Sequence, residues 1–336
     1  MAAEFLGVRA EAGETVYGSF DVDGVPIPLV LAAGAAGGPT LVVHCAQHAT
    51  EYSGSSMVGL LLRELDLSAL RGTVAIVPLC NIPFIVRTRL AEAYPSQAAS
   101  LRAADGTPRT NINRCWPGVA GGTWNEQLAD RLSRGLFAGA DTVLDYHSCR
   151  TCDPNFTGYV STSPASREVA LAFGFAAIDE TAAEGHFPGQ LHRRIPIELG
   201  VPAILIEMAP TSLKVQHHRV VEAACGATNV MKHLGMLAGE PVRAPVQVVF
   251  HRGSEQVNLR AGQLGFACFY RPEVDAVSKG DLIAEVRSLR DFSVLETHVA
   301  PCDGGLGSCG VAESQLVLPG EELATLQPGA EIIRNG

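Results

Sequence analysis

The sequence predicts an α/β fold, in which a mostly parallel mixed sheet carries helices on both faces and a small C-terminal all-β domain follows. The first observation is a set of apolar, β-branched runs of strand length with helical patterns between them: Thr40–Cys45, Thr73–Leu79, Thr142–Leu144 with Asp145, and Ala203–Ile206. Strands buried on both faces of a parallel sheet have such continuous apolar sequences. The second is a change near residue 240, where helical periodicity gives way to short alternating segments rich in Gly and Pro.

The N-terminal segment, residues 1–38, predicts two short strands over Thr15–Asp21 and Val25–Leu31. A flexible Gly/Ala-rich connection is expected over Ala32–Gly38, because its glycines lack the spacing of a phosphate-binding loop. After the first apolar run, Ser55–Leu65 predicts a helix, since its apolar side chains recur at helical spacing.

Each of the apolar runs leads into residues that titrate, bind metals or carry a charge. The first is followed by His48 and Glu51, the second by Asn81, Arg87 and Arg89, the third by Asp145 and His147, and the fourth by Glu207. The carboxyl ends of parallel strands meet at one edge of a sheet, where α/β proteins place their sites. We therefore expect these side chains to line one crevice.

His48 and Glu51 form a His-x-x-Glu pair directly after the first run. Three residues apart on one turn, an imidazole nitrogen and a carboxylate can converge on a single point. Zinc accepts both ligand types, and hydrolytic zinc sites use three protein ligands and keep one position open for water. The pair alone is a weak signal, because it also occurs on surface helices. We predict a metal site here because the pair follows directly after a strand.

A long polar segment, Ala91–Gly122, separates the second and third apolar runs. Segments of this length inside a compact domain are usually binding loops or lids. Within it, the Arg114 guanidinium can hold a carboxylate through two parallel hydrogen bonds, with the Asn113 amide beside it. A solvated loop arginine is the alternative interpretation.

The composition excludes several classes of protein. The chain has 336 residues, 47% of them hydrophobic and 18% charged, which is enough for a large core. It contains no apolar run of roughly 18 residues that could span a membrane, and its N-terminus lacks the pattern of a signal peptide. A net charge of −10 without a basic stripe argues against nucleic acid as a partner. Nine cysteines without framework spacing favour free thiols in the cytoplasm.

Four motifs in order make the chain resemble the succinylglutamate desuccinylase/aspartoacylase family of zinc carboxypeptidase-like hydrolases. The family's Gly-x-His-Gly-x-Glu is matched by Ala46–Glu51, and its Asn-Arg-x-Phe-Pro-Gly by Asn113–Gly118. Its Asp-x-His is matched by Asp145–His147, and its strand-end Glu by Glu207. The resemblance covers most of residues 40–210, and Ala46, Ala49 and Trp116 depart from the family's Gly, Gly and Phe.

The resemblance implies one zinc ion per chain, bound by His48, Glu51 and His147. It implies Glu207 as the general base that takes a proton from water and hands it to the leaving amine. Arg89 is expected to polarise the scissile carbonyl, with Arg87 as the close alternative, and Asn113 and Arg114 to bind the substrate. Asp145 either accepts a hydrogen bond from His147 or simply marks the strand end.

The C-terminal stretch also resembles the β-rich appendage of many family members. We expect two domains, residues 1–240 and 245–332, the second with strands over Gln247–His251, Gly265–Tyr270, Asp281–Val286, Val294–Val299 and Gln315–Leu318. Its Val-x-Lys-Gly-Asp pattern is similar to that of biotinyl and lipoyl carrier domains, but no lysine follows Lys279. This domain is therefore expected to cover the catalytic cleft and to carry no prosthetic group.

The sequence thus predicts a cytoplasmic, zinc-dependent amide hydrolase that removes the acyl group from a small N-acylated amino acid or related metabolite. A metallocarboxypeptidase with the same ligands is one alternative. A non-catalytic binding protein for acidic metabolites is the other. The expected partner is the small-molecule substrate, without nucleic acid or membrane, and a homo-oligomer is compatible with the sequence.

Overall fold

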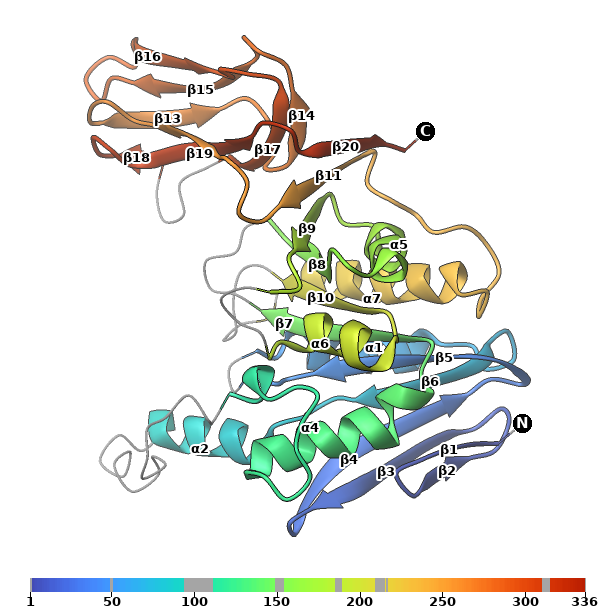
Figure 1. The fold of residues 1–336 in the computed structure, drawn as a ribbon. Coiled ribbons are helices and arrows are strands. Elements are labelled where there is room, and N and C mark those ends of the chain that lie inside the picture. The colour runs from blue at the N-terminus through green and yellow to red at the C-terminus, as the bar shows by residue number, and fades with distance from the viewer. Residues whose placement is uncertain are drawn as a thin grey trace.

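The structure, a computed structural model, describes residues 2–48, 51–93, 111–148, 154–184, 189–208, 215, 217–309 and 315–335, with the backbone alone at 89–93 and 308–309. Its centre is a ten-stranded sheet with the strand order β20-β11-β9-β8-β10-β7-β5-β6-β4-β3 (Figure 1). The bounds of these strands are β3 Thr15–Val22, β4 Val25–Ala33, β5 Ala36–Cys45, β6 Arg71–Val77, β7 Thr142–Ser148, β8 Phe156–Val160, β9 Ala177–Thr181, β10 Ala203–Met208, β11 Val246–His251 and β20 Glu331–Arg334. A separate hairpin pairs β1 (Ala3–Phe5) with β2 (Val8–Ala10).

The four predicted apolar runs form four neighbouring parallel strands, β6, β5, β7 and β10. Their carboxyl ends therefore lie at the same edge of the sheet, as the sequence predicts. Strand β8 is antiparallel to β10, and β9 and β11 follow the direction of β8. The expected mostly parallel mixed sheet is confirmed.

Helices cover both faces of the sheet. They are α1 Ser53–Glu64, α2 Ile82–Ala93, α4 Trp124–Gly135, α5 Pro164–Phe173, α6 Leu191–Leu199 and α7 His217–His233, with short 3-10 turns η3 Ile112–Arg114 and η4 Phe137–Gly139. The apolar sides of α1, α5 and α7 share one buried cluster with the sheet. Those of α4 and α6 share a second cluster with the other face. The helix expected over Ser55–Leu65 is α1.

Local sequence signals explain where these helices begin and end. Thr123 and Glu126 cap the start of α4 reciprocally, each side chain bonding the other residue's backbone N–H. Ser163 caps α5 just before its first residue, Pro164. Gly174, at a φ of 105°, ends α5 in the left-handed conformation that glycine adopts without strain.

The expected flexible connection over Ala32–Gly38 is wrong. Strand β4 continues through Ala33, β5 begins at Ala36, and the backbone N–H of Gly34 donates to Gly72 O over 2.8 Å. A Cβ on Gly34 would lie 2.2 Å from the Leu70 carbonyl oxygen. The small residues therefore permit close backbone packing, which is a structural role that composition alone does not distinguish from flexibility.

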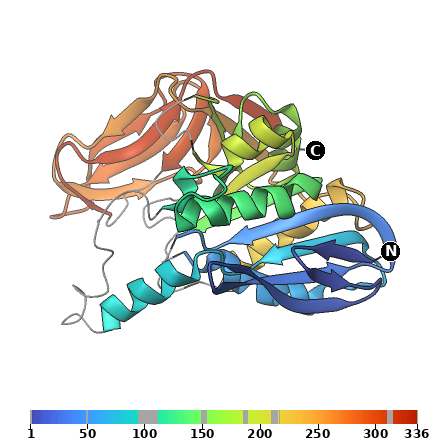
Figure 2. The same ribbon diagram turned by 60° about the horizontal axis from the view of Figure 1, so that its bottom comes forward.

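The C-terminal segment forms two four-stranded antiparallel sheets, as expected for an all-β unit. Their strands are β12 Val257–Arg260, β13 Gly265–Phe269, β14 Asp275–Val277, β15 Leu282–Arg287, β16 Val294–Val299, β17 Gly304–Cys309, β18 Leu316–Val317 and β19 Glu322–Gln327. Figures 1 and 2 show these orange and red strands gathered at the end of the molecule remote from the N-terminal strands. Strands β11 and β20 extend the large sheet, so the chain crosses between the two units twice.

The expected domain limits, 1–240 and 245–332, remain a prediction. No helix in the described part of the chain is both long enough and apolar enough to cross a membrane. Six described cysteines carry free thiols: Cys45, Cys80, Cys115, Cys225, Cys268 and Cys302. The Cys149 and Cys152 pair noted in the sequence lies outside the described residues.

Candidate active site

Three predicted metal ligands lie together at the carboxyl edge of the parallel strands. His48 follows β5, Glu51 precedes α1 and His147 is in β7, and ligand atoms of all three lie within 4.8 Å of one another. The two Glu51 oxygens lie 2.7 Å from His48 Nδ1 and 2.8 Å from His147 Nδ1. The side chains of His48 and Glu51 are 22% and 15% exposed, so the cluster is reached from solvent on one side.

Both histidines are held by acceptors at their other ring nitrogen. His48 Nε2 donates to Asn111 Oδ1 over 2.9 Å, and that oxygen also accepts the Asn113 N–H. His147 Nε2 donates to Asp145 Oδ2 over 2.9 Å. In the neutral imidazole, Nδ1 is then an acceptor that faces a Glu51 oxygen, which is also an acceptor. Two acceptors at these distances require a cation between them, either a proton or a metal ion.

The electrostatics of the cluster agree with this requirement. Burial opposes ionisation of Glu51, but the charges and hydrogen bonds of His147 and His48 lower its pKa to about 2. Burial likewise opposes charging of His147, and the carboxylates Asp145 and Glu51 raise its pKa well above the ordinary value. The site therefore stabilises positive charge beside Glu51 and His147.

Glu207 lies next to this cluster on the neighbouring strand. Its residue position in β10 is directly opposite His147 in β7, at the usual strand separation of about 4.8 Å. Its Oε2 is buried without a hydrogen-bond partner among the described residues. Burial raises the pKa of Glu207 to about 7, while the nearby His147 opposes this shift. A carboxyl group with such a pKa can accept and return a proton near neutral pH.

Asn113 and Arg114 lie on η3, beside the same cluster. Asn113 is 2% exposed, with its Oδ1 accepting the Leu191 N–H over 2.9 Å and its Nδ2 at 3.4 Å from His147 Nε2. The Arg114 Nη1 donates to the Asn113 carbonyl oxygen over 2.7 Å. The Asn113 amide therefore joins η3 to α6, and the half-buried Arg114 guanidinium lies at the side of the site.

The structure adds Arg193, which the sequence analysis did not single out. It belongs to α6, is 7% exposed, and its Nε and Nη1 are buried without a hydrogen-bond partner among the described residues. Burial, and then the positive charges of Arg252 and Arg114, lower its pKa. An unpaired buried guanidinium is costly, and an anionic ligand would relieve that cost. No local motif marks Arg193, because its burial arises only when α6 packs on the sheet.

The predicted carbonyl-polarising residues are only partly described. Arg89 belongs to α2, but its side chain lies outside the described residues. The Arg87 guanidinium lies over the Phe84 ring, 5.6 Å from its centroid. The choice between these two arginines remains a prediction.

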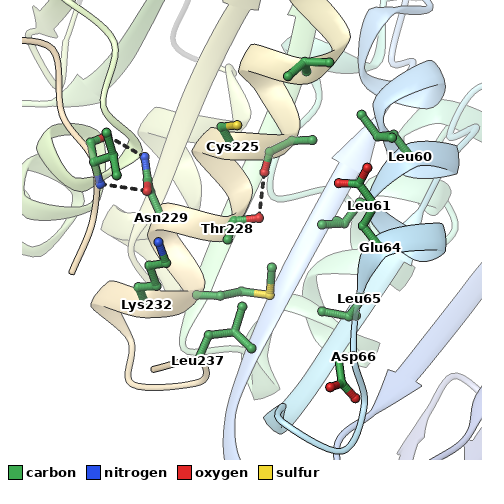
Figure 3. Close-up of a pocket in the computed structure, with 14 residues that line it drawn as sticks. Leu60, Leu61, Glu64, Leu65, Asp66, Cys225, Thr228, Asn229, Lys232 and Leu237 are labelled. Atoms are coloured by element: carbon green, nitrogen blue, oxygen red, sulfur yellow. Dashed lines mark hydrogen bonds between the residues drawn. The ribbon is translucent and has the colours of Figure 1, made fainter. Parts of the chain in front are cut away.

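A cavity of about 570 Å³ between α1 and α7 is separate from this site (Figure 3). Its lining includes Leu60, Glu64, Cys225 and Lys232. None of the predicted site residues whose side chains are described lines it, and α1 meets the candidate metal-ligand cluster at its other end, next to Glu51. Volume therefore does not identify the reactive centre of this protein, whereas the convergence of titratable groups does.

A mixed α/β sheet that gathers a His-Glu-His cluster and a carboxyl group with a buried oxygen at its strand ends is typical of metal-dependent hydrolases. The catalytic domain of the succinylglutamate desuccinylase/aspartoacylase family matches residues 37–234, more than half of the chain. The chain belongs to this family. It is a deacylase, an amide hydrolase of the type that this family comprises.

Individual relatives agree with this assignment. The N-alpha-acetyl-L-2,4-diaminobutyric acid deacetylase of Halomonas elongata is 27% identical over 281 residues, which cover 79% of this chain and 74% of that protein. The apo structure of the ectoine utilization protein EutE (DoeB) from Ruegeria pomeroyi is 25% identical, with a TM-score of 0.59 and coverage of 90% of each chain. A succinylglutamate desuccinylase from a Silicibacter species shares the fold, with a TM-score of 0.60, 22% identity and coverage of 94% of this chain and 93% of that one.

Proposed function

We propose that the protein is a zinc-dependent deacylase that removes a small acyl group, with acetyl as the first candidate, from an amino acid with a free carboxylate. The observation that carries the proposal is the convergence of one ligand atom each from His48, Glu51 and His147 within 4.8 Å, beside Glu207, whose Oε2 is buried without a hydrogen-bond partner among the described residues. The acetyl group and the amino-acid amine are suggested by the diaminobutyrate deacetylase relative.

The donor set fits zinc. Two imidazole nitrogens and one carboxylate are the three protein ligands typical of hydrolytic zinc sites, and Asn111 and Asp145 fix both imidazoles with Nδ1 toward Glu51. When bound, zinc would polarise the substrate carbonyl and lower the pKa of water. We propose one zinc ion per chain, held by His48, Glu51 and His147.

Glu207 would act as general base and then as general acid. Its carboxylate takes the proton of the attacking water and delivers it to the leaving amine, which needs a pKa near neutrality. Burial of the Glu207 side chain raises its pKa to about 7, which is in the required range. Arg89, or Arg87 in its place, would stabilise the negative charge that develops on the carbonyl oxygen.

Arg193 and Arg114 would hold the substrate carboxylate, with Asn113 fixing the position of η3. A protein of net charge −10 needs a local cationic site to bind an anion. Arg193 offers two buried nitrogens that have no hydrogen-bond partner in the described part of the chain. Burial lowers the pKa of Arg193, and the positive charges of Arg252 and Arg114 lower it further. A hydrogen bond between charged groups contributes about 1.5–3 kcal/mol, enough to select acids over neutral analogues.

The C-terminal unit would form the outer wall of the cleft. A polar cavity of about 600 Å³ is lined by Asp179 and Arg252 from the large sheet side and by Thr325 and Gln327 from β19. The Arg252 guanidinium lies 6.0 Å from the centroid of the Phe156 ring, and Phe156 is the strand partner of Glu207. The absence of any lysine after Lys279 argues against a prosthetic-group carrier. A cytoplasmic location, supported by the free thiols, belongs to the same proposal.

The test is amine release from a panel of N-acyl amino acids, with and without a chelator, together with elemental analysis. The panel should contain Nα-acetyl-2,4-diaminobutyrate, N-acetylaspartate, N-succinylglutamate, and for each the carboxamide analogue. We expect one zinc per chain, loss of activity with chelator, and preference for acids. Metal-free protein with chelator-resistant activity would refute the zinc assignment, and equal cleavage of acids and carboxamides would refute the carboxylate site.

A further inference from the structure

The fully buried carboxylate Asp145 is the centre of a hydrogen-bond network behind the metal-ligand cluster. Its Oδ2 accepts from His147 Nε2 over 2.9 Å, and its Oδ1 accepts from His44 Nδ1 over 2.9 Å. Gln47 Nε2 lies 2.7 Å from both oxygens. Each of these side chains is at most 2% exposed. An acceptor in this environment is held only by the donors that the protein itself supplies.

A left-handed residue at the end of β5 makes this network possible. Ala46 has a φ of 59°, which few non-glycine residues adopt. In a regular strand, residues three apart point to opposite faces. Here His44 and Gln47, three apart, both bond to Asp145. The turn at Ala46 therefore brings the Gln47 side chain to the side of the sheet where His44 lies, while His48 continues to the metal-ligand cluster.

Trp116 determines the orientation of the Gln47 amide. Its indole Nε1 donates to Gln47 Oε1 over 2.8 Å, and the ring is 3% exposed, packed edge-on against His44 at a centroid distance of 5.5 Å. Reversing the amide would direct its oxygen at the Asp145 carboxylate and its NH₂ at the indole N–H, so neither bond would survive. Phenylalanine, the residue of the family motif at position 116, has no N–H donor and therefore could not favour one orientation of the Gln47 amide over the other.

We propose that Trp116 and Gln47 are positioning residues for the metal ligand His147. The indole N–H fixes the Gln47 amide, the amide fixes the Asp145 carboxylate, and the carboxylate holds the His147 Nε2 proton. The Nδ1 lone pair of His147 is thereby directed at the Glu51 side, where the metal would bind. Neither positioning residue bonds to a ligand atom that faces the metal. The inference rests on the proposed metal site.

The experiment measures zinc affinity by titrating metal-free protein against a chromophoric chelator. Trp116→Phe keeps an aromatic ring and removes the indole N–H donor together with part of the ring system, and Gln47→Leu removes both polar atoms of the link. Loss of an outer partner of a metal-ligating His typically weakens affinity about 10–100-fold, and we expect at least about tenfold for either variant. Because the two residues act in series, the double variant should bind no more weakly than Gln47→Leu alone.

The protein has two tryptophans, and the second supplies a matched control. Trp124, the first residue of α4, donates its Nε1–H to the Val22 carbonyl oxygen over 3.2 Å, and its indole makes no hydrogen bond to Gln47, Asp145 or His44 among the described residues. Trp124→Phe should leave zinc affinity unchanged. Equal affinities for the Trp116→Phe variant, the Trp124→Phe variant and the parent protein would overturn the inference while leaving the metal site intact. A parent protein that binds no zinc would overturn the proposed function instead, and the inference with it.

A second measurement covers the case in which the Trp116→Phe variant folds poorly. Indole N–H signals are observed in the intact protein by ¹⁵N NMR and assigned with Trp124→Phe. We expect the Trp116 signal to exchange slowly with solvent and to shift on zinc addition, because its bond leads through Gln47 and Asp145 to the metal ligand. A signal that does not move on zinc binding would contradict the linkage.

Discussion

Replacing Glu207 by Gln should have opposite effects on stability and on turnover. In the folded, metal-free protein, burial raises the pKa of Glu207 to about 7 from the ordinary value of 4.5. The folded state therefore holds a proton that the unfolded chain has released, and stability falls as the pH rises from 4.5 to about 7. The pKa difference corresponds to about 3 kcal/mol at pH 8 as an upper estimate. Glutamine cannot ionise, so the stability of the variant does not fall with rising pH for this reason.

The assay is denaturant unfolding of the metal-free parent and variant between pH 5 and 8. We expect the gain in the free energy of unfolding to be less than about 1 kcal/mol at pH 5, where folded Glu207 stays protonated, and to rise to about 1–3 kcal/mol at pH 8. Glu168→Gln, the same substitution at an exposed position on α5, is the matched control. A gain of the same size at every pH would mean that packing, and not ionisation, separates the two proteins.

The same substitution should lower turnover of the zinc-loaded enzyme by about 10²–10⁴-fold, the usual contribution of a positioned acid/base group. Zinc content should be retained, because Glu207 is not among the three converging ligands. Near-normal turnover would assign the base elsewhere. A stabilised but inactive Glu207→Gln variant would show that the buried carboxyl group is kept for chemistry at a cost in stability.

Four further predictions concern the other parts of the site. Arg193→Gln, and to a lesser degree Arg114→Lys, should raise KM for acidic substrates by about 10–100-fold and leave carboxamide analogues unaffected; equal effects on both substrates would exclude a carboxylate clamp. His147→Ala should remove both bound zinc and the increase in unfolding temperature that zinc gives the parent; a retained increase would place the metal elsewhere. Ala46→Gly should stabilise the metal-free protein by about 1 kcal/mol, because glycine adopts a positive φ without strain, as checked by thermal unfolding. The Glu51 carboxylate, whose pKa is lowered to about 2, stabilises the metal-free protein above pH 4.5, and this effect is lost as the pH falls toward 2. The Glu51→Gln variant should therefore have a lower free energy of unfolding near neutrality, and that free energy should depend less on pH between 4.5 and 2 than it does in the parent protein.

Much of the fold was predictable because it depends on local signals. Apolar runs of strand length with helical patterns between them identify β5, β6, β7 and β10. Because parallel strands end at one edge of a sheet, the residues that follow these runs, His48, Glu51, His147 and Glu207, are expected to lie together. The connection over Ala32–Gly38 shows where this reasoning fails. Small residues are typical of both flexible linkers and tight backbone packing, and only the neighbouring Leu70 carbonyl decides between them.

The sequence alone also predicts the types of the candidate metal ligands and their order, since His-x-x-Glu is a pair set by one turn of chain and the third candidate, His147, lies at the end of a strand. The outer contacts were decided by tertiary structure. Trp116 lies 69 residues from Gln47, and Gln47 lies 98 residues from Asp145, yet these side chains are in direct hydrogen-bond contact. Arg193 becomes buried, with Nε and Nη1 unpaired among the described residues, only when α6 packs on the sheet. Local sequence patterns carry information about neighbours along the chain, whereas burial and long-range hydrogen bonds depend on which segments the fold brings side by side.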